Sequence, residues 1–141
     1  MLTIRHELNE ESASLLIEAA RAHAASIGVP QNIAVVDAGG RLLAFLRMDG
    51  AKFHSIETSL AKAVTAASIA APSGGAPSDA GVLVGIATRG AFTNLRGGLP
   101  VLVGDHVAGA IGVGSGAPDE DIAVAEAAIA ALRSKIDGAS D

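Results

Sequence analysis

The chain has 141 residues and a formal net charge of -5, with 50% hydrophobic residues, 2% aromatic residues and no cysteine. This length predicts one domain over residues 1–141, and the apolar content is enough for a packed core, which excludes intrinsic disorder. The acidic balance, without a cluster of Lys and Arg, argues against a nucleic-acid partner. The missing cysteines exclude disulfides, thiolate nucleophiles and Cys-ligated metal centres.

The sequence also argues against a membrane partner. Arg5, His6 and Glu7 precede the first apolar run, a pattern that does not match a signal peptide. No apolar stretch reaches the roughly 20 residues that a membrane helix needs. We therefore expect a soluble, cytoplasmic protein.

The first half of the chain predicts a helix, two strands and a second helix. The first helix begins after Asn9, a good N-cap residue, and ends at Gly28. The β-branched run at 33–37 and the apolar run at 42–48 are joined so briefly that they predict antiparallel neighbours. A second helix is predicted over about residues 52–70.

The second helix has two different faces. Its apolar positions, which we expect to pack on the sheet, are Phe53, Ile56, Leu60, Ala63, Val64 and Ala67. A polar stripe falls on nearly the opposite face and consists of His54, Thr58, Lys62 and Thr65.

The second half predicts further strands and a last helix. Periodicity does not decide between helix and strand for residues 82–87. The apolar runs at 99–103 and 107–113 predict another hairpin, and residues 92–95 are a candidate fifth strand. Pro118 opens the last helix. Because runs of strands lie between helices without strict alternation, the fold class is α+β.

Among the ionisable residues, His54 is the most informative. The four histidines, His6, His23, His54 and His106, have no compact metal-ligand spacing, so a zinc site within one chain is not predicted. His54 follows the Asp49-Gly50 turn and falls in the first turn of a helix, where the positive helix end favours a neutral imidazole. Such an imidazole can be a general base or a metal ligand, and a solvated helix face is the alternative.

Each of the other candidate features can have either a functional or a purely structural role. Lys62, two turns after His54 and flanked by alanines, can be approached by a ligand carboxylate or another subunit, or lie in solvent. Gly97 and Gly98 allow close backbone approach to a ligand, although paired glycines more often form a turn. The Ala-rich, aromatic-poor composition with few charges predicts apolar helix faces that pack on other subunits, hence a homo-oligomer.

Several segments together carry a family resemblance. They are VVDAGGRLLAFLRMDGA at 35–51, KAVTA at 62–66, GGLP at 97–100, GAIGV at 109–113 and DIAVA at 121–125. In this order they resemble the GlcG/HbpS-like heme-binding family, which includes the C-terminal domain of PduO-type corrinoid adenosyltransferases. The resemblance implies a profilin-like α-β-α domain with an antiparallel sheet of about five strands, assembled into dimers or larger oligomers.

The resemblance and the residues together support two functional hypotheses. The first is an oligomeric protein that binds heme or another tetrapyrrole, with His54 as the iron ligand if heme is bound. Its expected ligand-binding residues are Arg47, Asp49, His54, Thr58, Lys62, Gly97 and Gly98. The second is an enzyme for a small polar metabolite, in which His54 is the general base, Lys62 stabilises negative charge and Asp49 orients the imidazole.

Overall fold

The computed structural model describes residues 1–139 of the chain. Its elements follow in the order α1 (Glu10–Ser26), β1 (Asn32–Asp37), β2 (Leu42–Arg47), α2 (Ser55–Ile69), α3 (Ser78–Ala87), β3 (Gly98–Val103), β4 (His106–Gly114) and α4 (Pro118–Ala139). Four helices and one antiparallel sheet make this an α+β fold.

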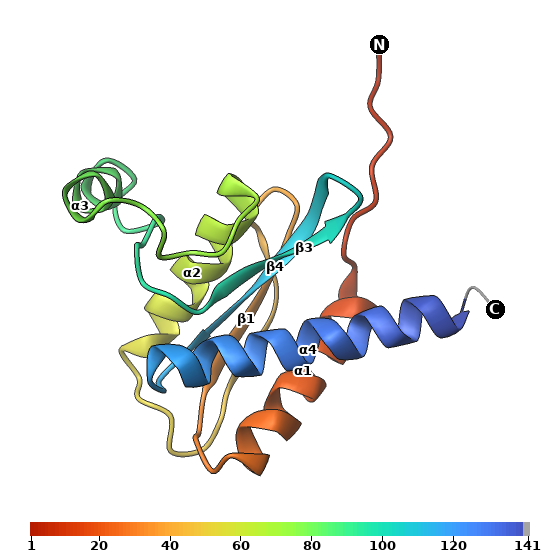
Figure 1. Ribbon diagram of the computed structural model, residues 1–141, viewed down its shortest axis with the longest axis horizontal. Coiled ribbons are helices and arrows are strands. Elements are labelled where there is room, and N and C mark those ends of the chain that lie inside the picture. The colour runs from red at the N-terminus through yellow and green to blue at the C-terminus, as the bar shows by residue number, and fades with distance from the viewer. Residues whose placement is uncertain (140–141) are drawn as a thin grey trace.

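The elements form three layers, with the sheet in the middle (Figure 1). α1 and α4 pack on each other and together cover one face of the sheet, and α2 covers the other face. α3 lies to one side, away from the sheet. Each face therefore has its own apolar core, one beneath α1 and α4 and a smaller one beneath α2.

The sheet has the strand order β2-β1-β4-β3, and every neighbouring pair is antiparallel. The prediction of a strand at residues 92–95 is wrong. Polar side chains of α2 and of the connection after it bond this segment instead: the Thr93 amide donates to Thr65 Oγ1 at 3.0 Å, and Ser73 Oγ donates to the Leu95 carbonyl at 2.7 Å. Backbone groups bonded in this way cannot also extend the ladder, so the sheet has four strands.

The start of α1 follows the prediction from the sequence. Asn9 is the N-cap: its side chain accepts from the Ser12 amide at 3.0 Å, and Ser12 Oγ accepts from the Asn9 amide at 2.9 Å. This reciprocal pair satisfies two amides that the helix itself leaves free. The buried face of α1 then packs into the larger core with Ala13, Leu16, Ile17, Ala20 and Ala24.

The predicted packing face of α2 is partly wrong. Phe53 precedes the helix and is 78% exposed, and His54 is the N-cap, so the helix begins later than predicted. Ser59 and Ala63 face β4 closely, because a Cβ added at Gly112 would lie only 2.5 Å from the Ala63 amide nitrogen. Small side chains therefore make the closest approach to the sheet, and Leu60 and Val64 pack against the same core while partly buried.

Residues 82–87, which periodicity left undecided, belong to helix α3. Four of its apolar side chains, Val82, Leu83, Val84 and Ile86, are exposed. Among the described residues, no helix combines the length and the apolar character that crossing a bilayer requires.

Candidate functional site

A small cavity lies where β4 ends and where α2 and α4 begin. Its volume is about 240 Å³. It is lined by Lys52, His54, Ser55, Thr58, Lys62, Leu95, Arg96, Ser115, Gly116, Pro118 and Asp121. These residues come from α2, from the loop before it, from the segment before β3, from the connection between β4 and α4 and from the first turn of α4.

The loop between β2 and α2 is anchored to the strand ends, which fixes the position of one cavity wall. The Lys52 amide donates to Ser115 Oγ at 2.8 Å, and Asn32 Nδ2 donates to the Lys52 carbonyl at 2.8 Å. The Met48 amide donates to the Gln31 carbonyl at 3.0 Å. His54 follows directly and caps α2 without a side-chain cap hydrogen bond, so its exposed imidazole stays available.

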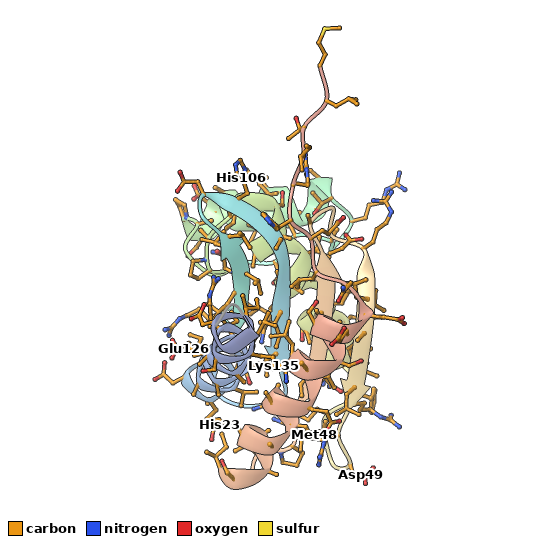
Figure 2. The ribbon with its side chains drawn as sticks, turned by 90° about the vertical axis from the view of Figure 1, so that its right-hand side faces the viewer. His23, Met48, Asp49, His106, Glu126 and Lys135 are labelled. Carbon is orange, nitrogen blue, oxygen red and sulfur yellow. The ribbon has the colours of Figure 1, made fainter. Side chains whose placement is uncertain are left out.

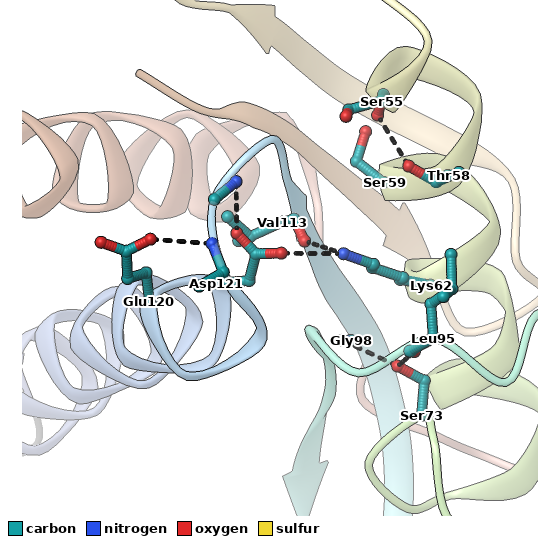
Figure 3. A network of polar contacts seen from close by, with 12 residues as sticks. Ser55, Thr58, Ser59, Lys62, Ser73, Leu95, Gly98, Val113, Glu120 and Asp121 are labelled. Atoms are coloured by element: carbon teal, nitrogen blue, oxygen red, sulfur yellow. Dashed lines mark hydrogen bonds and ion pairs between the residues drawn. The ribbon is translucent and has the colours of Figure 1, made fainter. Parts of the chain in front are cut away.

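A buried ion pair forms the inner wall of the cavity (Figure 3). Lys62 Nζ donates to Asp121 Oδ2 at 3.0 Å and to the Val113 carbonyl at 2.7 Å. The side chains of Lys62 and Asp121 are only 6% and 3% exposed. Asp121 Oδ1 accepts from the Gly116 amide at 3.0 Å, so both carboxylate oxygens have a donor. The pair connects α2 directly to the first turn of α4.

The environment of Asp121 acts on its protonation in two directions. Burial raises the pKa of the Asp121 carboxyl above its usual 3.8, because the charged form loses water. The hydrogen bond and charge of Lys62, together with the Gly116 amide, act to lower this pKa, and burial outweighs them. The ion pair is therefore held against a desolvation cost.

Gly97 and Gly98 have a packing role beside this ion pair. A Cβ at Gly98 would lie 2.6 Å from the Lys62 carbonyl carbon, so β3 approaches α2 at backbone contact. Gly97 has φ +131°, and a Cβ there would lie 3.0 Å from Lys62 Nζ and 3.1 Å from Asp121 Cβ. The two glycines cover the pair from the β3 side, and neither lines the cavity.

The structure brings together some of the residues predicted to form a site and separates others. His54, Thr58 and Lys62 all line the cavity. Arg47 and Asp49 are exposed and do not line it, and among residues 1–139 no hydrogen bond joins Asp49 to His54. Figure 2 shows Asp49 at the edge of the molecule, at the end opposite His106. The predicted orientation of the imidazole by Asp49 is therefore not present.

The lining residues that were not among the predicted site residues are Lys52, Ser55, Leu95, Arg96, Ser115, Gly116, Pro118 and Asp121. Asp121 lies 59 positions after Lys62, so no local spacing connects them. Its signals in the sequence were its place in the DIAVA segment of the family resemblance and its position in the first turn of the last helix, where an acidic residue stabilises the helix end without any partner.

Within the described part of the chain, no group of three or more His, Cys, Asp or Glu side chains could hold a metal ion. A porphyrin-bound iron has a different requirement, because the macrocycle supplies four ligands and the protein one or two. His54 is the one histidine that lines the cavity in the described residues. A single histidine therefore fits an iron that is already bound by a porphyrin better than it fits a free metal ion.

The fold and cavity define a class of protein with an antiparallel α-β-α architecture and a small polar cavity at one sheet end. The family described as "Haem degrading protein HbpS-like" matches residues 8–130. A 15.0 kDa protein from the dhaT-dhaS intergenic region of Citrobacter freundii is 36% identical over 125 residues, which are 84% of this chain and 87% of that protein. This chain belongs to the HbpS-like family.

Two solved structures are similar to this chain over almost its whole length. Protein ORFY of Klebsiella pneumoniae has a TM-score of 0.86 and 26% identity and covers 94% of each chain. The PduOC:heme complex has a TM-score of 0.79 and 26% identity, covering 89% of this chain and 94% of that one. The resemblance inferred from the sequence segments is thus confirmed.

Proposed function

We propose that this protein is an oligomeric small-molecule-binding protein whose ligand is heme or another tetrapyrrole. The observation that carries the proposal is the His54 imidazole, which lines the cavity without a capping bond in a chain of the HbpS-like family. The heme complex of the similar PduOC structure supports the same ligand class.

The residues around His54 suit the iron and the propionate groups of a heme. The imidazole is the iron ligand in this proposal, because a neutral ring nitrogen is a common axial donor to heme iron. Lys52 and Arg96 are exposed cations of the same cavity and would neutralise the propionate groups. When bound, heme would supply a redox-active iron at the position that His54 holds.

The size of the cavity argues that heme lies across its opening. A volume of about 240 Å³ is below the roughly 300–1,000 Å³ typical of pockets that enclose a drug-sized ligand. Leu95 lines the cavity and is 50% exposed, which offers one apolar contact. The other face of the ring would then need a second surface, which we assign to another copy of the chain.

Helix α3 is the surface that we propose for this contact between copies. Val82, Leu83 and Ile86 are 62%, 67% and 71% exposed. A groove between α3 and residues 92–95 includes Leu95, so the apolar surface continues to the cavity. An apolar helix of this kind is typically covered by another protein surface. The proposed homo-oligomer would cover it.

The enzymatic hypothesis has less support. Asp49 lies outside the cavity. His54 therefore lacks the orienting carboxylate that the hypothesis assigned to it. We accordingly propose a binding role.

A hemin titration followed by Soret absorbance tests the heme proposal. We expect a saturable shift with wild-type protein, loss of that shift in His54→Ala, and its retention in the control His106→Ala. His106 lies at the far end of the molecule from Asp49 and outside this cavity (Figure 2). A shift that fails to saturate, or that survives in His54→Ala, would contradict iron ligation by His54.

A further inference from the structure

The cavity concentrates positive charge in an acidic protein. Lys52, Lys62 and Arg96 line it, and Asp121 is the one carboxylate in its wall. The chain as a whole has a formal net charge of -5. Cations gathered in a recess of an acidic chain attract an anionic group there more strongly than elsewhere on the surface.

Lys62 has a donor that the fold does not use. A lysine ammonium has three N–H donors. The Val113 carbonyl and Asp121 Oδ2 accept from two of them, and no further acceptor bonds Lys62 within the described residues. Because Lys62 also lines the cavity, the remaining donor is available to a ligand oxygen.

Asp121 does not prevent an anion from approaching this donor. Its Oδ2 is held by Lys62 and its Oδ1 by the Gly116 amide, so both oxygens already have a donor. Lys52 is exposed, and the Arg96 side chain is 54% exposed and pairs with Asp119 at 3.5 Å, a surface ion pair that a ligand anion can displace. An anionic group would thus meet one fixed donor and two adjustable cations.

We propose that the inner part of the cavity is a carboxylate subsite, in which Lys62 donates to a ligand carboxylate and Lys52 and Arg96 neutralise it. The carboxylate belongs either to a tetrapyrrole propionate or to a free small organic acid, since both present the same group. This inference deepens the proposed function and rests on it for the identity of the cavity as the ligand site.

Calorimetric titration with malonate, with malonamide as its neutral counterpart, tests the subsite. We expect saturable binding of malonate alone. Lys52→Gln/Arg96→Gln should raise the dissociation constant about tenfold, because charged hydrogen bonds are lost from exposed side chains whose removal leaves the fold intact. Arg21→Gln/Lys135→Gln removes the same charge from α1 and α4 outside the cavity and should change it less than about twofold.

Three results would contradict the proposed subsite. The first is equal binding of malonate and malonamide, and the second is an unchanged malonate dissociation constant in Lys52→Gln/Arg96→Gln. The third is an equal rise of that constant in the control Arg21→Gln/Lys135→Gln. Lys62→Met/Asp121→Asn, which removes both charges of the pair, should abolish malonate binding if it folds. If Lys62→Met/Asp121→Asn does not fold, Lys52→Gln/Arg96→Gln still tests the subsite.

Competition with hemin separates the two carboxylate sources. If a propionate occupies the subsite, hemin displaces malonate and hemin dimethyl ester does not; if the ligand is a free acid, malonate binds without displacement by either. The heme proposal has its own readout, the Soret shift lost in His54→Ala. If malonate binds but the Soret shift is absent, heme ligation by His54 is wrong and the carboxylate subsite stands. If the Soret shift is present but malonate does not bind, the carboxylate subsite is wrong and heme ligation stands.

Discussion

At the scale of single residues, Lys62 connects helix α2 to helix α4 through its buried ion pair with Asp121. Its position beside His54 and Thr58 on one helix stripe follows from helical periodicity alone, and all three line the cavity. Its burial depends on Gly97, just before β3, on Gly98 and on Asp121, which are distant in the chain. Local spacing carries no information on such partners, so the ion pair was not predictable.

The buried pair leads to a first prediction. Lys62→Met leaves Asp121 buried without its cation, which should lower the free energy of unfolding by about 3–5 kcal/mol. Lys62→Met/Asp121→Asn removes the unpaired charge and keeps an acceptor for the Gly116 amide, so most of this loss should be recovered. Urea denaturation of the wild type and both variants measures the difference, and equal stability of both variants would contradict it.

The pKa of Asp121 gives a second prediction, for the pH dependence of stability. Burial raises this pKa in the folded protein above the usual 3.8, so between the two values the native state binds more protons than the unfolded state. The contribution of Asp121 to the free energy of unfolding is therefore fully present below 3.8 and is lost as pH rises through the folded pKa.

Asp121→Asn lacks this titration. The stability of the wild type relative to Asp121→Asn should therefore fall as pH rises above 3.8. Urea denaturation of both proteins over a series of pH values measures this difference, in which titrations common to both cancel. If the stability of the wild type relative to Asp121→Asn instead rises with pH above 3.8, pairing with Lys62 outweighs burial in setting the pKa of Asp121.

At the scale of elements, helix α2 and strand β4 show which patterns predict packing and which do not. Hydrophobic periodicity identified α2 as a helix, because its apolar residues recur at helical spacing. Of the two residues that face Gly112, it placed Ala63 on the sheet face but not Ser59, and it also placed the exposed Phe53 there. A glycine in a strand signals a close approach, but the sequence does not say which helix approaches.

This close approach predicts a large effect of one added methyl group. In Gly112→Ala the new Cβ would lie 2.5 Å from the Ala63 amide nitrogen, so α2 must move, at a cost of about 1–3 kcal/mol or more. Gly75→Ala is the matched control, because a Cβ there meets nothing within 4 Å. Thermal or urea denaturation compares them, and equal effects would mean that the packing of α2 tolerates the shift.

At the scale of the whole molecule, the three layers and the antiparallel order agree with the expected α-β-α architecture. Turn residues and short apolar runs identified all four strands because their boundaries are marked by Gly, Pro or Asp. The fifth strand was wrong because side chains bond the backbone of residues 92–95, which periodicity does not reveal: Thr65 Oγ1 accepts from the Thr93 amide, and Ser73 Oγ donates to the Leu95 carbonyl.

Helix α3 provides the prediction at this scale. Leu83→Glu/Ile86→Glu places charges on its exposed apolar surface and should convert the proposed oligomer into smaller species without unfolding the chain. Leu2→Glu/Ile4→Glu, at residues that are even more exposed but lie outside α3, is the control and should leave the assembly unchanged. Size-exclusion chromatography with light scattering gives the masses. A monomeric wild type, or equal effects of both pairs, would refute the assignment.

The central pairing of β1 with β4 also has a consequence for synthesis on the ribosome. Val35 faces Ile111 across this pair, so the middle of the sheet cannot close until β4 has left the exit tunnel. Until then the hairpin of β1 and β2 has one unpaired edge, which runs along the apolar residues from Ile33 to Val36 of β1. An unpaired apolar edge is where a chain aggregates, so the nascent chain is most vulnerable between the emergence of β1 and that of β4.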